Sequence, residues 1–175
     1  MDGPRSQKKT FREIERYVIV AAMAMLPLSC HGQNLCPWLN VATASGVLGG
    51  PATMTLDKTD DHTETCVFRS QASPAADVLR ISVTTVADPQ NADQELFSHE
   101  NRCASSVVPL KAVGNGAILC TTETARSRGA EVIGRVRNSI FSIEIHSHSR
   151  RSDATRNLLK ENIEEVANQV AGALF

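Results

Sequence analysis

The chain has 175 residues, of which 42% are hydrophobic and 21% charged, and its formal net charge at pH 7 is −1. This composition excludes a disordered protein, and the length favours a single domain. Neither the net charge nor the aromatic content of 4% favours nucleic-acid binding, and the five cysteines are an odd number that any disulfide pattern has to explain.

The first 29 residues have the pattern of a secretory signal peptide. Residues 1–16 contain five basic and three acidic side chains, and residues 17–29 carry no charge. This uncharged run is too short for a transmembrane helix, which needs about 20 apolar residues. An uncleaved anchor and a buried core helix are the alternatives. We therefore expect a protein exported to the cell envelope, either membrane-anchored or secreted. The predicted division is a signal peptide at 1–29, a tether at 30–35 and a single domain at 36–175.

The segment before Cys30 resembles the cleavage box of bacterial lipoproteins, in which a cysteine after a small residue becomes the lipidated N-terminus. Ser29 fits this box, whereas Pro27 and Leu28 depart from it. The competing interpretation is ordinary signal cleavage after Gly32. Lipid on Cys30 is therefore the candidate membrane anchor.

Once Cys30 is lipidated or removed, an even number of cysteines remains, which indicates two disulfide bonds in an exported chain. The remaining residues are Cys36, Cys66, Cys103 and Cys120. Of the three connectivities that four cysteines allow, we favour the pairing of sequence neighbours, Cys36 with Cys66 and Cys103 with Cys120. A zinc site is the alternative use of four cysteines, but none of them has the CxxC or CxxH spacing of such sites.

The N-terminal half of the domain predicts short helices followed by strands. We expect a helical turn at 37–40, a short helix at 44–48 with Thr43 as its N-cap, strands at 52–56, 63–69 and 78–84, and a helix at 91–103. In the third strand, Leu79, Ile81 and Val83 alternate with polar residues, as in a sheet with one solvated face.

The C-terminal half predicts further strands and one long helix. Extended segments are expected at 107–113, 117–121, 131–137 and 140–146. Pro109 places the first at a sheet edge, and Asn138-Ser139 joins the last two as a hairpin. The helix at 153–174 carries one apolar stripe, formed by Leu159, Ile163, Val166, Val170 and Leu174. The predicted fold class is α+β, an antiparallel β-sheet packed by a long C-terminal helix and by short N-terminal and middle helices.

Six short segments, made of helix caps, turns and strand patterns, follow one another along the domain. They are CPWLN (36–40), TASGVLGGP (43–51), CVF (66–68), LRISV (79–83), VPLKAVGNGA (108–117) and AGALF (171–175). In these segments the chain resembles a family of small exported bacterial proteins, often lipoproteins, with a domain of unknown function. The resemblance covers most of residues 35–175 and implies a PsbP-like α/β sandwich, an antiparallel sheet with helices on one side. It implies an envelope protein without an established activity and supplies no catalytic residue.

The chemistry-bearing residues of the chain form no recognisable catalytic motif. There is no GxSxG in the chain and no SxxK within the predicted domain at 36–175, and the Gly-Asn-Gly run at 114–116 lacks the spacing of a phosphate-binding loop and predicts a turn. His146 and His148 share one face of a predicted strand, but no third metal ligand is identifiable from the sequence. We therefore expect neither an enzyme nor a bound metal or cofactor.

Charge is divided unevenly along the chain. Residues 30–100 contain 3 basic and 9 acidic side chains, whereas residues 101–175 contain 10 basic and 7 acidic ones. Arg135 and Arg137 share one face of a predicted strand, where they would form a basic stripe. The candidate basic patch consists of Arg126, Arg128, Arg135, Arg137, Arg150 and Arg151. Such a patch suits an anionic lipid, a cell-wall polymer or an acidic protein, and ordinary solvated arginines are the alternative.

These expectations combine into one functional hypothesis. The protein is expected to be a non-catalytic binding or accessory module of the cell envelope, and its partner is an envelope protein or an anionic envelope component. Nucleic acid is not an expected partner, because side chains for base stacking are few. The alternative is a small-ligand or lipid carrier with a pocket between sheet and helix. An envelope hydrolase that uses a histidine with a serine or aspartate ranks third.

Overall fold

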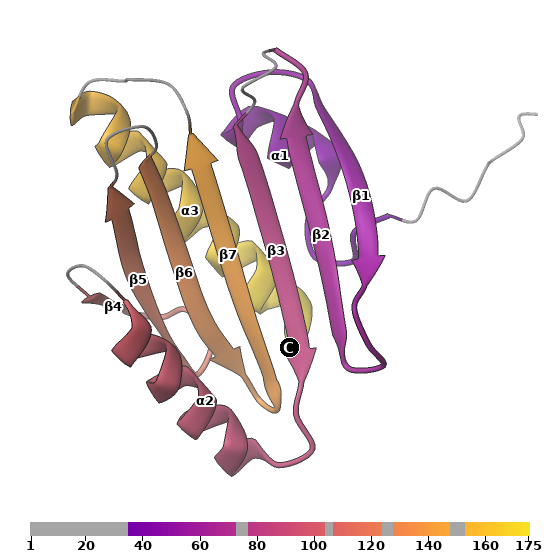
Figure 1. Cartoon of the computed structure of the whole chain (residues 1–175), viewed down its shortest axis with the longest axis vertical. Helices are drawn as coiled ribbons and strands as arrows, with labels where there is room; N and C mark the ends of the chain where they lie inside the picture. Colours follow the sequence, from indigo (N-terminus) through magenta and orange to yellow (C-terminus); the bar gives the residue numbers. More distant parts are fainter. Residues whose placement is uncertain (1–34, 73–76, 104–106, 124–127, 148–152) are drawn as a thin grey trace, which may run out of the picture. The chain divides into compact units, whose positions relative to one another are not determined.

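The described residues form a seven-stranded antiparallel sheet with three helices (Figure 1). The computed structural model describes residues 35–72, 77–103, 107–123, 128–147 and 153–175. The strands are β1 (Ala52–Lys58), β2 (Thr63–Ser70), β3 (Val78–Thr85), β4 (Val107–Leu110), β5 (Gly116–Glu123), β6 (Arg128–Val136) and β7 (Ser139–Ser147). The helices are α1 (Val41–Val47), α2 (Pro89–Arg102) and α3 (Asp153–Leu174). The predicted α+β class is therefore confirmed.

The strand order is β1-β2-β3-β7-β6-β5-β4, which places two antiparallel meanders side by side. Strands β1 to β3 run inward from one edge. The chain then crosses through α2 to the opposite edge and returns through β4, β5 and β6, so that β7 pairs with β3. The central pairing, for example Ile81 opposite Ile143, thus joins segments that lie far apart in the sequence.

Alternate residues of the central strands point toward α3 and form the main core. Phe68 on β2, Leu79 and Ile81 on β3, and Phe141 and Ile143 on β7 are fully buried in it. The apolar stripe of α3 packs against them through Ile163, Val166 and Val170, which are also fully buried. The alternation predicted for β3 and the stripe predicted for the last helix are confirmed, since both patterns report burial on one face.

Helix α2 packs on the opposite face of the sheet. Its Ala92 is buried in a second apolar cluster with Ile118 of β5, Ile133 of β6 and Ile140 of β7. Each of these isoleucines has a chain neighbour in the main core, so each points to the other face. The arrangement with helices on one side only, which the resemblance implied, is therefore wrong for α2, because the outer face carries an apolar patch of its own.

Two helices begin earlier than the sequence predicted. The N-cap of α1 is Asn40, whose Oδ1 accepts the Thr43 N–H at 2.8 Å, so Thr43 lies inside the first turn. The predicted helical turn at 37–40 is not helical in the structure. The N-cap of α2 is Asp88, whose carboxylate accepts the Gln90 N–H at 2.9 Å. In both cases an Asn or Asp upstream of the predicted start satisfies the free N–H groups of the first turn.

The β6–β7 turn lies one residue earlier than predicted. It consists of Arg137 and Asn138, with Val136 paired to Ser139 across it. Arg137 has a left-handed φ of 54°, and its N–H donates to Asn115 Oδ1 at 2.7 Å. The position of the turn therefore depends on a side chain from the β4–β5 connection, which the local sequence pattern does not contain.

The predicted signal peptide at 1–29, Cys30 and residues 31–34 of the predicted tether lie outside the described residues. All described residues belong to one compact unit, Gly32–Phe175. None of the helices that the structure describes is both long enough and apolar enough to cross a membrane.

Candidate functional site

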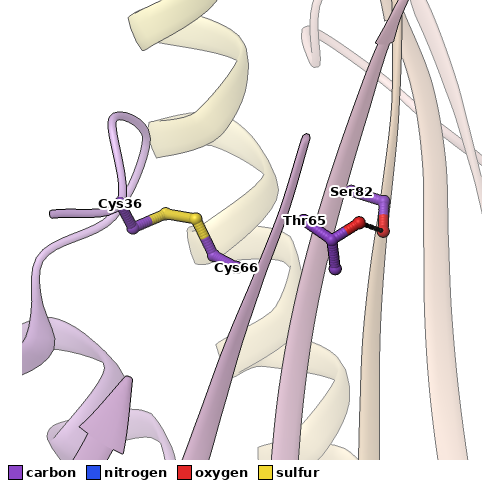
Figure 2. The surroundings of a disulfide bond; sticks show 4 residues. All are labelled: Cys36, Thr65, Cys66 and Ser82. Atoms are coloured by element: carbon purple, nitrogen blue, oxygen red, sulfur yellow. Dashed lines mark hydrogen bonds between the residues drawn. A yellow bond between two sulfur atoms is a disulfide. The ribbon is translucent and has the colours of Figure 1, made fainter. Parts of the chain in front are cut away.

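The four cysteines of the domain lie in two pairs at disulfide distance. The Cα atoms are 5.8 Å apart for Cys36 and Cys66, and 5.9 Å apart for Cys103 and Cys120. These are the pairings that we favoured from the sequence. The first bridge, drawn in Figure 2, ties the segment before α1 to β2, and the second ties the end of α2 to β5. The bridges thus fix one covering segment on each face of the sheet.

Two members of the candidate basic patch, Arg135 and Arg137, have described side chains. They do not form the stripe predicted for one strand face, because Arg137 has left β6 and lies in the left-handed turn. Both line one cleft instead. Three other members lie outside the described residues: Arg126, Arg150 and Arg151. The side chain of the last member, Arg128 at the start of β6, is not described.

The cleft has a volume of about 410 Å³ and lies where three connections meet at one end of the sheet. The loop before α2, the β4–β5 turn and the β6–β7 turn all contribute to its walls. Its lining residues are Ala87, Pro89, Asn115, Arg135, Arg137 and Asn138. A second pocket, of about 570 Å³, shares Ala87 and Asn138 and extends the depression toward the β1–β2 turn.

Arg135 holds α2 on the sheet. Its Nε lies 3.1 Å from Asp93 Oδ1, and its Nη1 donates to the Pro89 carbonyl at 3.3 Å. Only 20% of its side chain is exposed. The Asp93 carboxylate therefore neutralises the charge of Arg135, which forms a fixed wall of the cleft.

Arg137 is held at the cleft by its backbone. Its N–H is bound to Asn115 Oδ1, and the Asn115 N–H donates to the Arg135 carbonyl at 2.7 Å. Its guanidinium carbon lies 5.9 Å from the centroid of the Phe175 ring, within cation–π range. Among the described residues Arg137 forms no ion pair. Its charge is therefore available for the carboxylate or phosphate group of a ligand.

The lining of the adjoining pocket includes one carboxylate and several hydroxyl groups. Asp60 accepts the His62 N–H at 2.7 Å, and this hydrogen bond lowers the pKa of the Asp60 carboxyl. The hydroxyl oxygens of Thr63 and Thr84 lie 3.1 Å apart in the same lining. The end of the sheet thus presents a cation on one side and carboxylate and hydroxyl oxygens on the other.

A second polar surface covers the outer face of β2, β3 and β7. The hydroxyl oxygens of Thr65 and Ser82 lie 2.9 Å apart there, on the opposite side of the sheet from the Cys36–Cys66 bridge (Figure 2). Ser142 lies opposite Ser82 on the next strand. Hydroxyl groups therefore follow one another across three strands.

Glu144 and His146 form an ion pair on this outer face, with 3.5 Å between Glu144 Oε2 and His146 Nε2. Their hydrogen bond raises the pKa of the His146 imidazole and lowers the pKa of the Glu144 carboxyl, and burial opposes both shifts. Arg80, opposite Glu144 in the strand register, further favours the ionised carboxylate. Gly129 lies opposite His146, and a Cβ there would come within 3.0 Å of the imidazole Nδ1, so this glycine makes room for the ring.

The order of these groups along β7 does not suit nucleophilic catalysis. Ser142 and His146 share a face, but they lie four positions apart along the strand, a distance of about 13 Å. Glu144 lies between them, whereas a catalytic triad needs the imidazole between nucleophile and acid. His148, the other half of the predicted histidine pair, lies outside the described residues. In the described part of the chain, no group of three His, Cys, Asp or Glu side chains is placed to hold a metal ion.

The Glu144–His146 pair is expected to stabilise the fold most between pH 4.5 and 6.5. The contribution of Glu144 disappears as the pH falls through its lowered pKa, and that of His146 disappears as the pH rises through its raised pKa. Because both side chains are partly exposed, we expect His146→Gln to cost less than about 1 kcal/mol in this window and nothing well above it.

Urea unfolding of the intact protein from pH 4 to 9 measures this difference. The matched control is His62→Gln in the exposed β1–β2 turn, for which no ion pair is found among the described residues. A cost of His146→Gln that stays constant across the pH range would contradict the ion pair.

Sequence reasoning missed several residues that line the cleft or contact its arginines. The sequence pattern assigns Asn115 only to a turn, although an asparagine between two glycines is a residue whose side chain often binds nearby backbone. Phe175 and Asp93 carry no local signal, since their roles arise from contacts with Arg137 and Arg135 across the fold.

Comparison with protein-family models and with curated proteins finds no match to this chain.

Proposed function

We propose that this chain is an exported cell-envelope protein that acts as a non-catalytic binding or accessory module. The disulfide pairs are compatible with an oxidising, extracytoplasmic compartment. Lipid on Cys30 is the proposed membrane anchor. The partner is an envelope protein or an envelope component that presents an anionic group.

The observation that carries this proposal is the setting of Arg137 in the cleft. Its backbone is fixed by Asn115, its guanidinium lies against the Phe175 ring, and the neighbouring Arg135 is already neutralised by Asp93. A cation on a fixed backbone loses little backbone entropy on binding, and its guanidinium favours a phosphate or carboxylate group. The pocket beside the cleft contributes hydroxyl and carboxylate oxygens, from Thr63, Thr84 and Asp60, for the rest of such a ligand.

The interior favours a surface binder over a carrier. The space between the central strands and α3 is occupied by Phe68, Phe141, Ile143 and Ile163, all fully buried. A lipid carrier needs this space for its cargo. The proposed binding surface is instead the depression at the end of the sheet.

Replacing Arg137 by glutamine is expected to weaken binding of inorganic phosphate to the intact protein about tenfold, because one charge-assisted hydrogen bond is lost. The substitution retains the N–H that binds Asn115. Amide chemical shifts of residues 115 and 137, followed during titration with phosphate and separately with acetate, measure the affinity and distinguish the two anions.

The control is Arg69→Gln, an exposed arginine on β2, which should leave both affinities unchanged. Equal phosphate affinity of Arg137→Gln and the unaltered protein would contradict the proposed site. Turnover of an ester, peptide or glycan that is lost on mutating one polar cluster would contradict the non-catalytic role. The intact mass of the protein recovered from an envelope fraction tests the anchor, since a diacylglycerol adduct on Cys30 is expected.

A further inference from the structure

Strand β1 is an edge of the sheet whose outward hydrogen-bonding groups can be identified. The Pro51 carbonyl accepts from the Gln71 N–H at 2.8 Å, and the Thr59 N–H donates to the Thr63 carbonyl at 3.1 Å. In an antiparallel pair the bonded residues alternate, so Thr53, Thr55 and Asp57 also bond to β2. The N–H and C=O groups of the residues between them point away from the sheet.

The hydrogen bond of Ala52 agrees with this assignment. Its N–H donates outward to Ser45 Oγ of α1 at 3.1 Å. The next outward residues, Met54 and Leu56, have no backbone partner on that side among the described residues. Two consecutive outward positions thus offer a donor and an acceptor each, which is what an added antiparallel strand requires.

The two edges of the sheet differ in how well they are protected against the addition of another strand. The opposite edge, β4, has four residues and contains Pro109, both of which hinder strand addition. β1 has seven residues and carries no charge from Ala52 to Leu56. Its one lysine, Lys58, lies at the end of the strand and pairs with Glu64 of β2. The middle of β1 therefore lacks the usual protection of a sheet edge.

A groove of about 610 Å³ runs along this edge. One wall is β1 itself, from Ala52 to Asp57, and Leu35 and Val41 form the other. Leu35 is 67% exposed, and Met54 and Leu56 are half-buried against the core. The groove therefore combines unpaired backbone groups with an apolar lining on the side of α1.

We propose that this edge of β1 binds an extended peptide segment of a partner protein as an additional antiparallel strand. Alternate side chains of the segment would be apolar and lie on Leu35, Val41, Met54 and Leu56, and the others would be polar. The antiparallel direction places the N-terminal end of the segment beside exposed Asp57, and Asp60 and Asp61 follow in the turn. A basic residue is therefore expected at that end.

A single peptide segment fits this groove better than the edge of a second copy. In a second copy the outer side of β1 is already lined by its own Leu35 and Val41. Two such edges brought together would place both sets of side chains in the space that one added strand needs. The acidic residues at the end of β1 would also find no basic partner on the same edge of a copy, apart from Lys58, which pairs with Glu64.

The probe is a synthetic peptide, Lys-Val-Thr-Val-Thr-Val with an amidated C-terminus, added to the intact protein. At a peptide concentration ten times its Kd, hydrogen exchange of the Met54 and Leu56 amides is expected to slow about tenfold. The amides of Thr53 and Thr55 already bond to β2 and should change little. Met54→Pro removes the outward N–H without removing a β1–β2 bond and is expected to weaken binding about tenfold.

The matched variant is Met54→Val, which retains the N–H and an apolar side chain and should therefore bind the peptide more tightly than Met54→Pro does. Unchanged affinity of Met54→Pro would overturn the proposal, as would peptide binding that leaves exchange at residues 54 and 56 unaltered. The proposal would also be overturned if, without peptide, exchange at these amides became slower as the protein concentration increased. The occupant of the edge would then be a second copy. Phosphate binding at the Arg137 cleft is measured separately and does not depend on this result.

Discussion

Replacing Gly134 by alanine is expected to lower the free energy of unfolding by about 3 kcal/mol, a large effect for one methyl group. Gly134 lies opposite Phe141 in the β6–β7 pair. A Cβ at this position would overlap Phe141 Cζ, and it would come within 2.8 Å of Phe141 Cε1 and 3.0 Å of the Ala117 Cβ. The Phe141 ring is fully buried and cannot move aside into solvent. The strain must therefore be absorbed by the packing of three neighbouring strands.

Urea unfolding of the intact protein measures this effect, and Gly172→Ala provides the matched control. Gly172 lies exposed in α3, and a Cβ there would meet nothing within 4 Å, so alanine should stabilise the helix by about 0.5–1 kcal/mol. Phe141→Leu removes the ring atoms that cause the clash. The double variant Gly134→Ala, Phe141→Leu should thus be more stable than the sum of the single effects predicts, by about 1 kcal/mol or more. Additive single effects would show that the clash is not the cause.

The parts of the fold that the sequence predicted are those with a periodic signal of burial. The alternation of Leu79, Ile81 and Val83 and the stripe through Ile163, Val166 and Val170 each report one buried face, and both are found in the structure. The strand order was not contained in these patterns, because the pairing of β3 with β7 joins distant segments. The side on which α2 lies depends on Ile118, Ile133 and Ile140, which come together only after three strands have paired.

The candidate site was predictable only in its residue types. The arginine-rich segment drew attention to Arg135 and Arg137, but a strand pattern placed both on one face. Their actual roles differ because Asn115, from another connection, holds Arg137 in a left-handed turn, and Asp93, from α2, pairs with Arg135. Such a cleft arises from the register of several strands, and no window of the sequence contains it.

Removing the Cys36–Cys66 bridge by the double replacement Cys36→Ala, Cys66→Ala is expected to lower the free energy of unfolding by about 3.5 kcal/mol, from the chain entropy of a loop of 30 residues. Cys66 is fully buried on β2, and the bridge holds the segment that contains Trp38 and Leu39 against the core. Trp38 is the only tryptophan of the chain and is 9% exposed. Its fluorescence therefore reports whether this segment stays packed.

The double replacement Cys103→Ala, Cys120→Ala serves as the comparison. It separates the effect of a bridge on the unfolded chain from the effect of the first bridge on the packing of the native segment around Trp38. Its loop is shorter, with a separation of 17, so the expected entropic loss is about 3 kcal/mol. It lies at α2 and β5, away from the tryptophan, and native Trp38 emission should remain unchanged. Loss of the first bridge should instead shift the native emission to longer wavelength, because residues 36–39 belong to no helix or strand. Equal emission from both variants would mean that apolar packing of Trp38 and Leu39 alone holds this segment, and that the bridge acts only on the unfolded chain.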